Sequence, residues 1–144
     1  MLKNARALGL KIGFTCSTFD LLHAGHIAML EEAKEQCEFL IVGLLSDPTI
    51  DRPDTKNIPV QSLFERWLQL QSVRYVDMIV PFSNEKDIVD MLLIIRPDIR
   101  IVGEEYRDTE FTGHDLPIEI YFNKREHSFS SSELRCRVVN GEKK

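Results

Sequence analysis

Cysteine, glycine and tryptophan are scarce in this chain, and patterns that depend on them are missing. The 144 residues include 3 cysteines, 7 glycines and 1 tryptophan. The cysteines, Cys16, Cys37 and Cys136, are odd in number and share no metal-ligand spacing, which indicates reduced thiols rather than a disulfide framework. No G-x-G-x-x-G turn follows the first predicted strand, which argues against a dinucleotide-binding oxidoreductase.

Long hydrophobic runs and an excess of positive charge are also missing. No segment reaches the length of a membrane span, and the first residues lack the apolar centre of a signal peptide. The formal net charge is −5, whereas a domain that binds a long nucleic acid is usually basic. We therefore expect a cytoplasmic protein without membrane or nucleic-acid partners. A small anionic ligand stays possible, because it needs only a local positive pocket.

Apolar runs alternate with helical patterns along the chain. Strands are predicted over residues 10–16, 39–45, 76–80, 99–102 and 118–122. Helices are predicted over 27–36, from the Ser62 and Glu65 capping-box pair onward, from about 84 to 96, and over 130–139. Strict alternation predicts an α/β fold, here a single Rossmann-like, doubly wound domain over residues 1–144 with its core at about 10–139. It has about five parallel strands with helices on both faces.

The most informative segment joins the first predicted strand to the first predicted helix. His23 and His26 lie three residues apart and enclose Ala24 and Gly25. In a parallel sheet the ligand binds at the carboxyl ends of the strands, where this segment falls. Imidazoles beside the free N–H groups of a helix start form a site for a phosphate group.

Three segments carry a family resemblance. Residues 18–26, Thr-Phe-Asp-Leu-Leu-His-Ala-Gly-His, resemble the HxGH signature of the cytidylyltransferase-like nucleotidyltransferases. Residues 74–77, Arg-Tyr-Val-Asp, are similar to a segment of the branch that acts on glycerol 3-phosphate, phosphocholine or phosphoethanolamine. Arg125 and the hydroxyl-rich residues 129–135 are similar to the third motif of the family. Together these motifs span nearly the whole chain, from about residue 10 to residue 139.

Two positions depart from the family pattern. Ser17 stands where the family usually has glycine. The loop after the second strand offers Arg52 and Lys56, where the family often has two lysines.

The resemblance implies a reaction in which a substrate phosphate attacks the α-phosphorus of a nucleoside triphosphate and pyrophosphate leaves. It implies that His23 and His26 are the catalytic residues. The residues that bind the nucleotide would be Thr18, Phe19, His23, His26, Arg125, Ser130, Ser131 and Ser132. Contacts to the second substrate are assigned to Lys56, Lys86 and Glu104. Mg²⁺ would be bound with the nucleoside triphosphate, and no residue is predicted as a protein ligand to a metal.

The branch resemblance favours transfer of CMP from CTP to glycerol 3-phosphate, which gives CDP-glycerol. Two alternatives stay open: an adenylyltransferase of the same fold, acting on heptose phosphate or flavin mononucleotide, and a non-catalytic nucleotide-binding module. The family also implies a homodimer, with residues 74–77 where the subunits meet. For some residues a structural role competes with function: Asp20 is expected to brace the motif loop, and Arg66 to form an ion pair, a subunit contact or a ligand contact.

Overall fold

A computed structural model of the chain describes residues 1–142. Its centre is one parallel sheet of five strands in the order β3-β2-β1-β4-β5. The strands are β1 (Ile12–Ser17), β2 (Phe39–Leu45), β3 (Met78–Phe82), β4 (Ile99–Gly103) and β5 (Glu119–Asn123). The sheet confirms the predicted α/β, Rossmann-like architecture.

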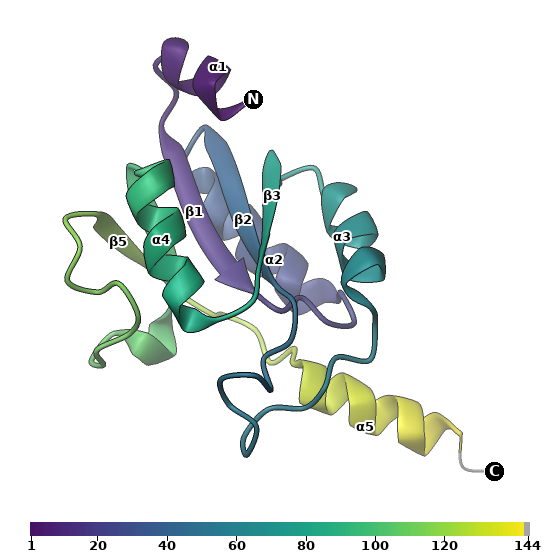
Figure 1. The fold of residues 1–144 in the computed structure, drawn as a ribbon. Coiled ribbons are helices and arrows are strands. Elements are labelled where there is room, and N and C mark those ends of the chain that lie inside the picture. Colours follow the sequence, from purple (N-terminus) through teal and green to yellow (C-terminus); the bar gives the residue numbers. More distant parts are fainter. Residues whose placement is uncertain (143–144) are drawn as a thin grey trace.

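Helices cover both faces of the sheet (Figure 1). They are α1 (Leu2–Ala7), α2 (Ala24–Glu35), α3 (Leu63–Gln71), α4 (Glu85–Ile95), the short 3₁₀ turn η1 (Glu104–Tyr106) and α5 (Ser131–Gly141). Helices α1 and α4 lie over one face, and α2 and α3 over the other. Helix α5 extends away from the sheet and has no buried residue.

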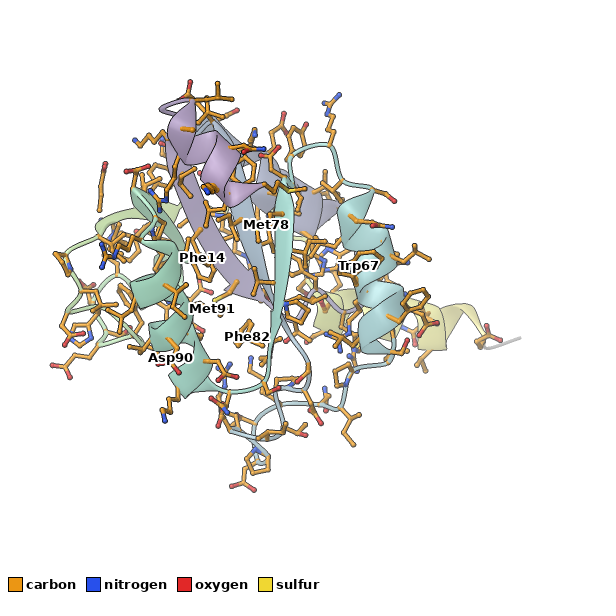
Figure 2. The ribbon with its side chains drawn as sticks, turned by 45° about the horizontal axis from the view of Figure 1, so that its top comes forward. Phe14, Trp67, Met78, Phe82, Asp90 and Met91 are labelled. Carbon is orange, nitrogen blue, oxygen red and sulfur yellow. The ribbon has the colours of Figure 1, made fainter. Side chains whose placement is uncertain are left out.

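Each face of the sheet has its own apolar core. Figure 2 shows Phe14 of β1, Phe82 of β3 and Met91 of α4 between α4 and the sheet, and all three belong to one buried cluster. The other cluster includes Leu30 of α2 and Leu70 of α3. Strand β2 is buried along its whole length, which explains why its sequence is a continuous apolar run.

The helix boundaries follow from local sequence signals. Ser62 and Glu65 form the predicted reciprocal capping box at the start of α3, and Asn84 caps α4 in the same way. Helix α4 ends at Arg96 in the left-handed conformation, directly before Pro97. Ser130 caps α5 by accepting a hydrogen bond from the Glu133 N–H at 3.1 Å.

Several boundaries differ from the sequence prediction, and strand β1, for example, begins at Ile12 rather than at residue 10. Helix α2 begins at Ala24 rather than at residue 27, because the histidines themselves cap it. Strand β3 lies two residues later than predicted. The first residues form helix α1, which packs the buried Ala5 against the core, and the Arg6 guanidinium donates to the carbonyls of Ile95 and Arg96 at the end of α4.

The sheet order also locates a crevice. Strands β2 and β3 follow one another on one side of β1, and β4 and β5 follow on its other side. The direction of winding therefore reverses at β1. Ligands of such sheets bind at this switch point, beyond the carboxyl ends of the strands. No helix within residues 1–142 is long and apolar enough to cross a membrane.

Candidate active site

A cleft of about 1000 Å³ opens at the carboxyl ends of β1 and β4. The structure brings most of the predicted site residues together there. Those that line it are Thr18, His23, His26, Lys56, Glu104, Arg125, Ser130 and Ser131. Ser17, at the end of β1, lines it as well. Phe19, Lys86 and Ser132 do not line the cleft.

His23 is the N-cap of α2, and its ring is held by the helix that it caps. Its Nδ1 accepts a hydrogen bond from the Gly25 backbone N–H at 3.0 Å. In a neutral ring the proton must then be on Nε2, since one ring nitrogen accepts and the other donates. This Nε2 lies 3.1 Å from the Ser131 hydroxyl. The cap therefore fixes the tautomer and presents a donor to the cleft.

His26 completes the cap in the same manner. Its Nδ1 accepts from the His23 backbone N–H at 3.2 Å, which places its proton on Nε2 too. The two rings stack with centroids 3.9 Å apart. The motif thus uses the N-terminal N–H groups of a helix, which are otherwise unpaired, to orient two stacked imidazoles.

Both imidazoles are neutral at physiological pH. Burial, with a contribution from the nearby His23 ring, lowers the pKa of His26 to about 4. Burial also lowers the pKa of His23, and the nearby guanidinium groups of Arg125 and Arg137 lower it further. The cationic groups around His23 make this end of the cleft attractive to an anion.

The start of α5 forms the opposite wall of this end. Ser130 caps the helix and Ser131 contacts His23. Arg125 has a positive φ of 22° and donates to the Phe129 carbonyl at 3.4 Å. His127, for which the sequence predicts no functional role, also lines the cleft and stacks on Phe129 with centroids 5.3 Å apart. The N-terminus of a helix, together with hydroxyl groups and a guanidinium, is suited to binding a phosphate group.

Gly25 allows the two walls to approach each other. A Cβ at this position would lie 2.9 Å from His23 Cε1, 3.0 Å from Phe129 Cβ and 3.1 Å from His127 Cε1. The glycine of the motif is therefore required by close packing between the start of α2 and the segment before α5.

Buried side chains stabilise the loop between β1 and α2, which carries the histidine motif. Phe19 is 1% exposed, has a positive φ of 50° and lies against the His26 ring. The Asp20 carboxylate accepts from the backbone N–H groups of Val60 and Gln61 and pairs with Arg135 at 2.7 Å. Asp20 thus has the structural role expected of it, and its ion pair ties α5 to the motif.

Arg66 is also structural. It is 2% exposed, and its guanidinium donates to four backbone carbonyls, those of Thr18, Leu45, Ser46 and Gln61. Burial lowers its pKa from the usual value. A guanidinium with four carbonyl acceptors holds the loops after β1 and β2 together.

The other end of the cleft, on the α4 side of the sheet, is lined by charged residues from several elements. Arg52 and Lys56 come from the loop after β2, Glu85 from α4, and Arg100 from β4. Glu104 lies at the edge and is paired with Arg107 at 2.6 Å. Within residues 1–142 no group of three His, Cys, Asp or Glu side chains is arranged to hold a metal ion.

Residues 74–77, which carried the branch resemblance, lie outside this cleft. The Asp77 carboxylate accepts from the Leu40 N–H at 2.8 Å and pairs with Lys34. Arg74 is exposed and donates to the Tyr75 hydroxyl at 2.8 Å. This segment therefore makes contacts within its own chain and none with the cleft.

Comparison with known proteins gives consistent matches. A family model described as Cytidylyltransferase-like matches residues 14–137. Curated relatives include the "Bifunctional protein HldE" of Campylobacter jejuni, 36% identical over 86% of this chain and 27% of the relative. The protein of that name from Paramagnetospirillum magneticum is 38% identical over 95% of this chain and 26% of the relative. The chain thus spans about a quarter of the length of these relatives.

Solved structures share the fold. A lipopolysaccharide core biosynthesis protein from Thermoplasma volcanium is 22% identical, with a TM-score of 0.59 over 92% of this chain and 88% of the other. Pantothenate synthetase from Thermus thermophilus is 17% identical, with a TM-score of 0.55 over 85% of this chain and 59% of the other. At these identities the likeness is one of architecture.

Proposed function

The chain belongs to the cytidylyltransferase-like family of nucleotidyltransferases, and we propose that it transfers AMP from ATP to a phosphorylated sugar such as a heptose phosphate. The observation that best supports a nucleotidyl transfer is the pair of oriented Nε2–H donors on His23 and His26. They face a cleft whose opposite wall is the start of α5. Such donors stabilise charge on transferring and leaving phosphates.

The proposed reaction needs no proton acceptor. An oxygen of the sugar phosphate attacks the α-phosphorus of ATP, the bond from that phosphorus to the bridging oxygen breaks, and pyrophosphate leaves with the electron pair. Because the nucleophile is already an anion, catalysis depends on position and charge. His23 and His26 donate to phosphate oxygens as neutral imidazoles, and Arg125 with Ser130 and Ser131 holds the leaving pyrophosphate. Mg²⁺ enters bound to the ATP phosphates, as a part of the substrate.

Three residues assigned by resemblance do not line the cleft. One of them, Phe19, supports the site as the buried neighbour of His26. Ser132 and Lys86 lie outside the residues that line the cleft and take no part in the proposed contacts. Thr18 lines the cleft beside the motif and stays assigned to the nucleotide, while Lys56 and Glu104 stay assigned to the second substrate.

ATP and a heptose phosphate are favoured over CTP and glycerol 3-phosphate. The curated relatives named HldE support synthesis of an ADP-heptose. The sequence-based expectation of CTP and glycerol 3-phosphate drew on the resemblance of residues 74–77, whose contacts are internal and away from the cleft. That segment therefore makes no contact that would select the base of the nucleotide.

A panel of substrates tests the proposal. Pyrophosphate release is measured with ATP or CTP against heptose 1-phosphate, glycerol 3-phosphate and flavin mononucleotide. We expect turnover with ATP and the heptose phosphate, at least tenfold faster than with any CTP pair. Turnover with CTP alone would reject the adenylyl assignment, and binding of ATP without turnover of any pair would favour a non-catalytic module.

A further inference from the structure

Two arginines are buried among residues 1–142, and they differ in their partners. Arg66 donates to four carbonyls. Arg100 is 6% exposed and lines the cleft. Within residues 1–142 its guanidinium donates to one carbonyl, that of Thr112, and its other neighbour is the Cys16 thiol. A buried charge is costly unless it is paired.

Arg100 makes no direct ion pair within residues 1–142, and the Glu85 carboxylate acts on its charge only from a longer distance. Within residues 1–142 no carboxylate lies within 4.0 Å of its guanidinium. Burial raises the pKa of the Cys16 thiol to about 11, so this neighbour is neutral. The Phe111 ring lies over the guanidinium at 5.2 Å and shields it from solvent on one side.

A second guanidinium at the same end is also incompletely paired. The Nε of Arg52 is buried and has no hydrogen-bond partner within residues 1–142, and its Nη2 lies 3.8 Å from a Glu85 oxygen. The other oxygen of Glu85 accepts from the Thr112 hydroxyl at 2.6 Å. Arg52, Glu85, Thr112 and Arg100 therefore form one connected group, to which the loop adds Lys56.

The position of this group favours contact with the acceptor substrate rather than with the nucleotide. Side chains alternate along a strand, and Ile99 and Ile101 belong to the core on the α2 face, so Arg100 lies on the α4 face. The imidazoles lie at the start of α2, on the opposite face. In a displacement at phosphorus the attacking and leaving groups are roughly in line, so the two anions enter from opposite sides of the α-phosphorus.

We propose that Arg100, with Arg52 and Lys56, forms the subsite that binds the phosphate group of the acceptor sugar phosphate and holds it against the α-phosphorus. This inference rests on the proposed function for the identity of the reaction. The cations neutralise the phosphate as it approaches the triphosphate, and Glu85 positions Arg52. Arg100 thereby determines the specificity for a phosphorylated acceptor.

The test compares substrate dependence in Arg100→Met, Arg100→Lys and Arg52→Met with the parent enzyme, using ATP and heptose 1-phosphate. A lost charge-assisted hydrogen bond raises the KM for the sugar phosphate by about tenfold to a hundredfold. The KM for ATP stays within about twofold, and Arg100→Lys recovers part of the loss. Arg74→Met, which removes an exposed arginine outside the cleft, is the matched control and behaves as the parent.

An unchanged KM for the sugar phosphate in both Met variants would overturn the proposal, as would an equal rise in both KM values. Arg52→Met keeps the test valid if Arg100→Met does not fold, because the Arg52 side chain is 41% exposed.

A binding experiment separates this inference from the proposed function. If the parent turns over no substrate pair, calorimetric titration with heptose 1-phosphate, glycerol 3-phosphate and inorganic phosphate is run in the presence of a non-hydrolysable ATP analogue. Binding to the parent that is lost in Arg100→Met supports the subsite even without turnover. Failure of all three anions to bind the parent would refute the subsite.

Discussion

At the scale of single residues, the site depends on backbone groups that decide where protons lie. The N–H groups of Gly25 and His23 point at the two Nδ1 atoms, so each ring carries its proton on Nε2, the nitrogen that faces the cleft; in His23 this nitrogen lies 3.1 Å from the Ser131 hydroxyl. The sequence identified the two histidines, but it could not reveal their tautomers, because these depend on the cap geometry. A histidine cap replaces the usual Ser, Thr, Asp or Asn cap.

The lowered pKa of His26 predicts a pH dependence of stability. The unfolded chain binds a proton at this residue near the ordinary histidine value of 6.5, whereas the folded chain resists protonation down to about 4. Its contribution to stability is therefore complete above pH 6.5 and is lost progressively as the pH falls toward 4. An NMR titration of the imidazole in the folded protein measures the midpoint.

The matched variant for this prediction is His26→Asn, whose side-chain oxygen can replace Nδ1 as the acceptor of the cap. Chemical denaturation across the same pH range gives a flatter stability profile for this variant than for the parent. A midpoint at or above 6.5 in the parent would show that the buried, neutral ring is the wrong description.

At the scale of elements, two helix starts meet across the cleft. Helix α2 supplies the imidazoles and α5 supplies hydroxyls, and the Asp20–Arg135 ion pair holds the two helices in place. Both helices and the Ser130 cap were predictable from the sequence, although α2 begins at Ala24 and not at the predicted residue 27. It did not assign Arg100, although a charged residue between Ile99 and Ile101 of a predicted buried strand is itself a signal.

The contact at Gly25 predicts an effect on binding rather than on folding. Alanine favours a helix over glycine by about 1 kcal/mol, but its Cβ would displace the His23 ring and residues 127–129. We expect Gly25→Ala to fold and to bind an ATP analogue at least tenfold more weakly, as measured by calorimetry. Gly141→Ala is the control, because nothing lies within 4 Å of its added Cβ. Equal affinity of Gly25→Ala and the parent would contradict the close-packing argument.

At the scale of the whole molecule, the chemistry is concentrated at one edge of the sheet while apolar side chains are exposed elsewhere. Phe64 and Leu68 of α3 are 67% and 46% exposed, and Val138 and Val139 of α5 are 58% and 59% exposed. Phe64 and Leu68 lie four residues apart, on the same side of α3, and exposed apolar residues that lie together are typical of interaction surfaces. Strand and helix locations were predictable because hydrophobic periodicity is local, whereas this surface and the sheet order depend on contacts between distant segments.

We propose a homodimer on this basis and on the family resemblance. Light scattering coupled to gel filtration is expected to give twice the chain mass of 16.7 kDa. Phe64→Asp together with Leu68→Asp shifts the mass toward that of the monomer if α3 lies in the interface. A parent protein that elutes as a monomer at all concentrations would reject the dimer and leave the active-site proposal unaffected.

We propose that the two oriented imidazoles bind the triphosphate during the transfer of its nucleotidyl group. The most direct measurement is pyrophosphate release from ATP and heptose 1-phosphate by the parent and by His23→Asn, with melting temperatures recorded for both. Asparagine keeps the helix cap and removes the Nε2–H donor. We therefore predict a melting temperature close to that of the parent and a turnover rate reduced by about a hundredfold or more. A folded His23→Asn variant that turns over at the rate of an active parent would contradict the claim.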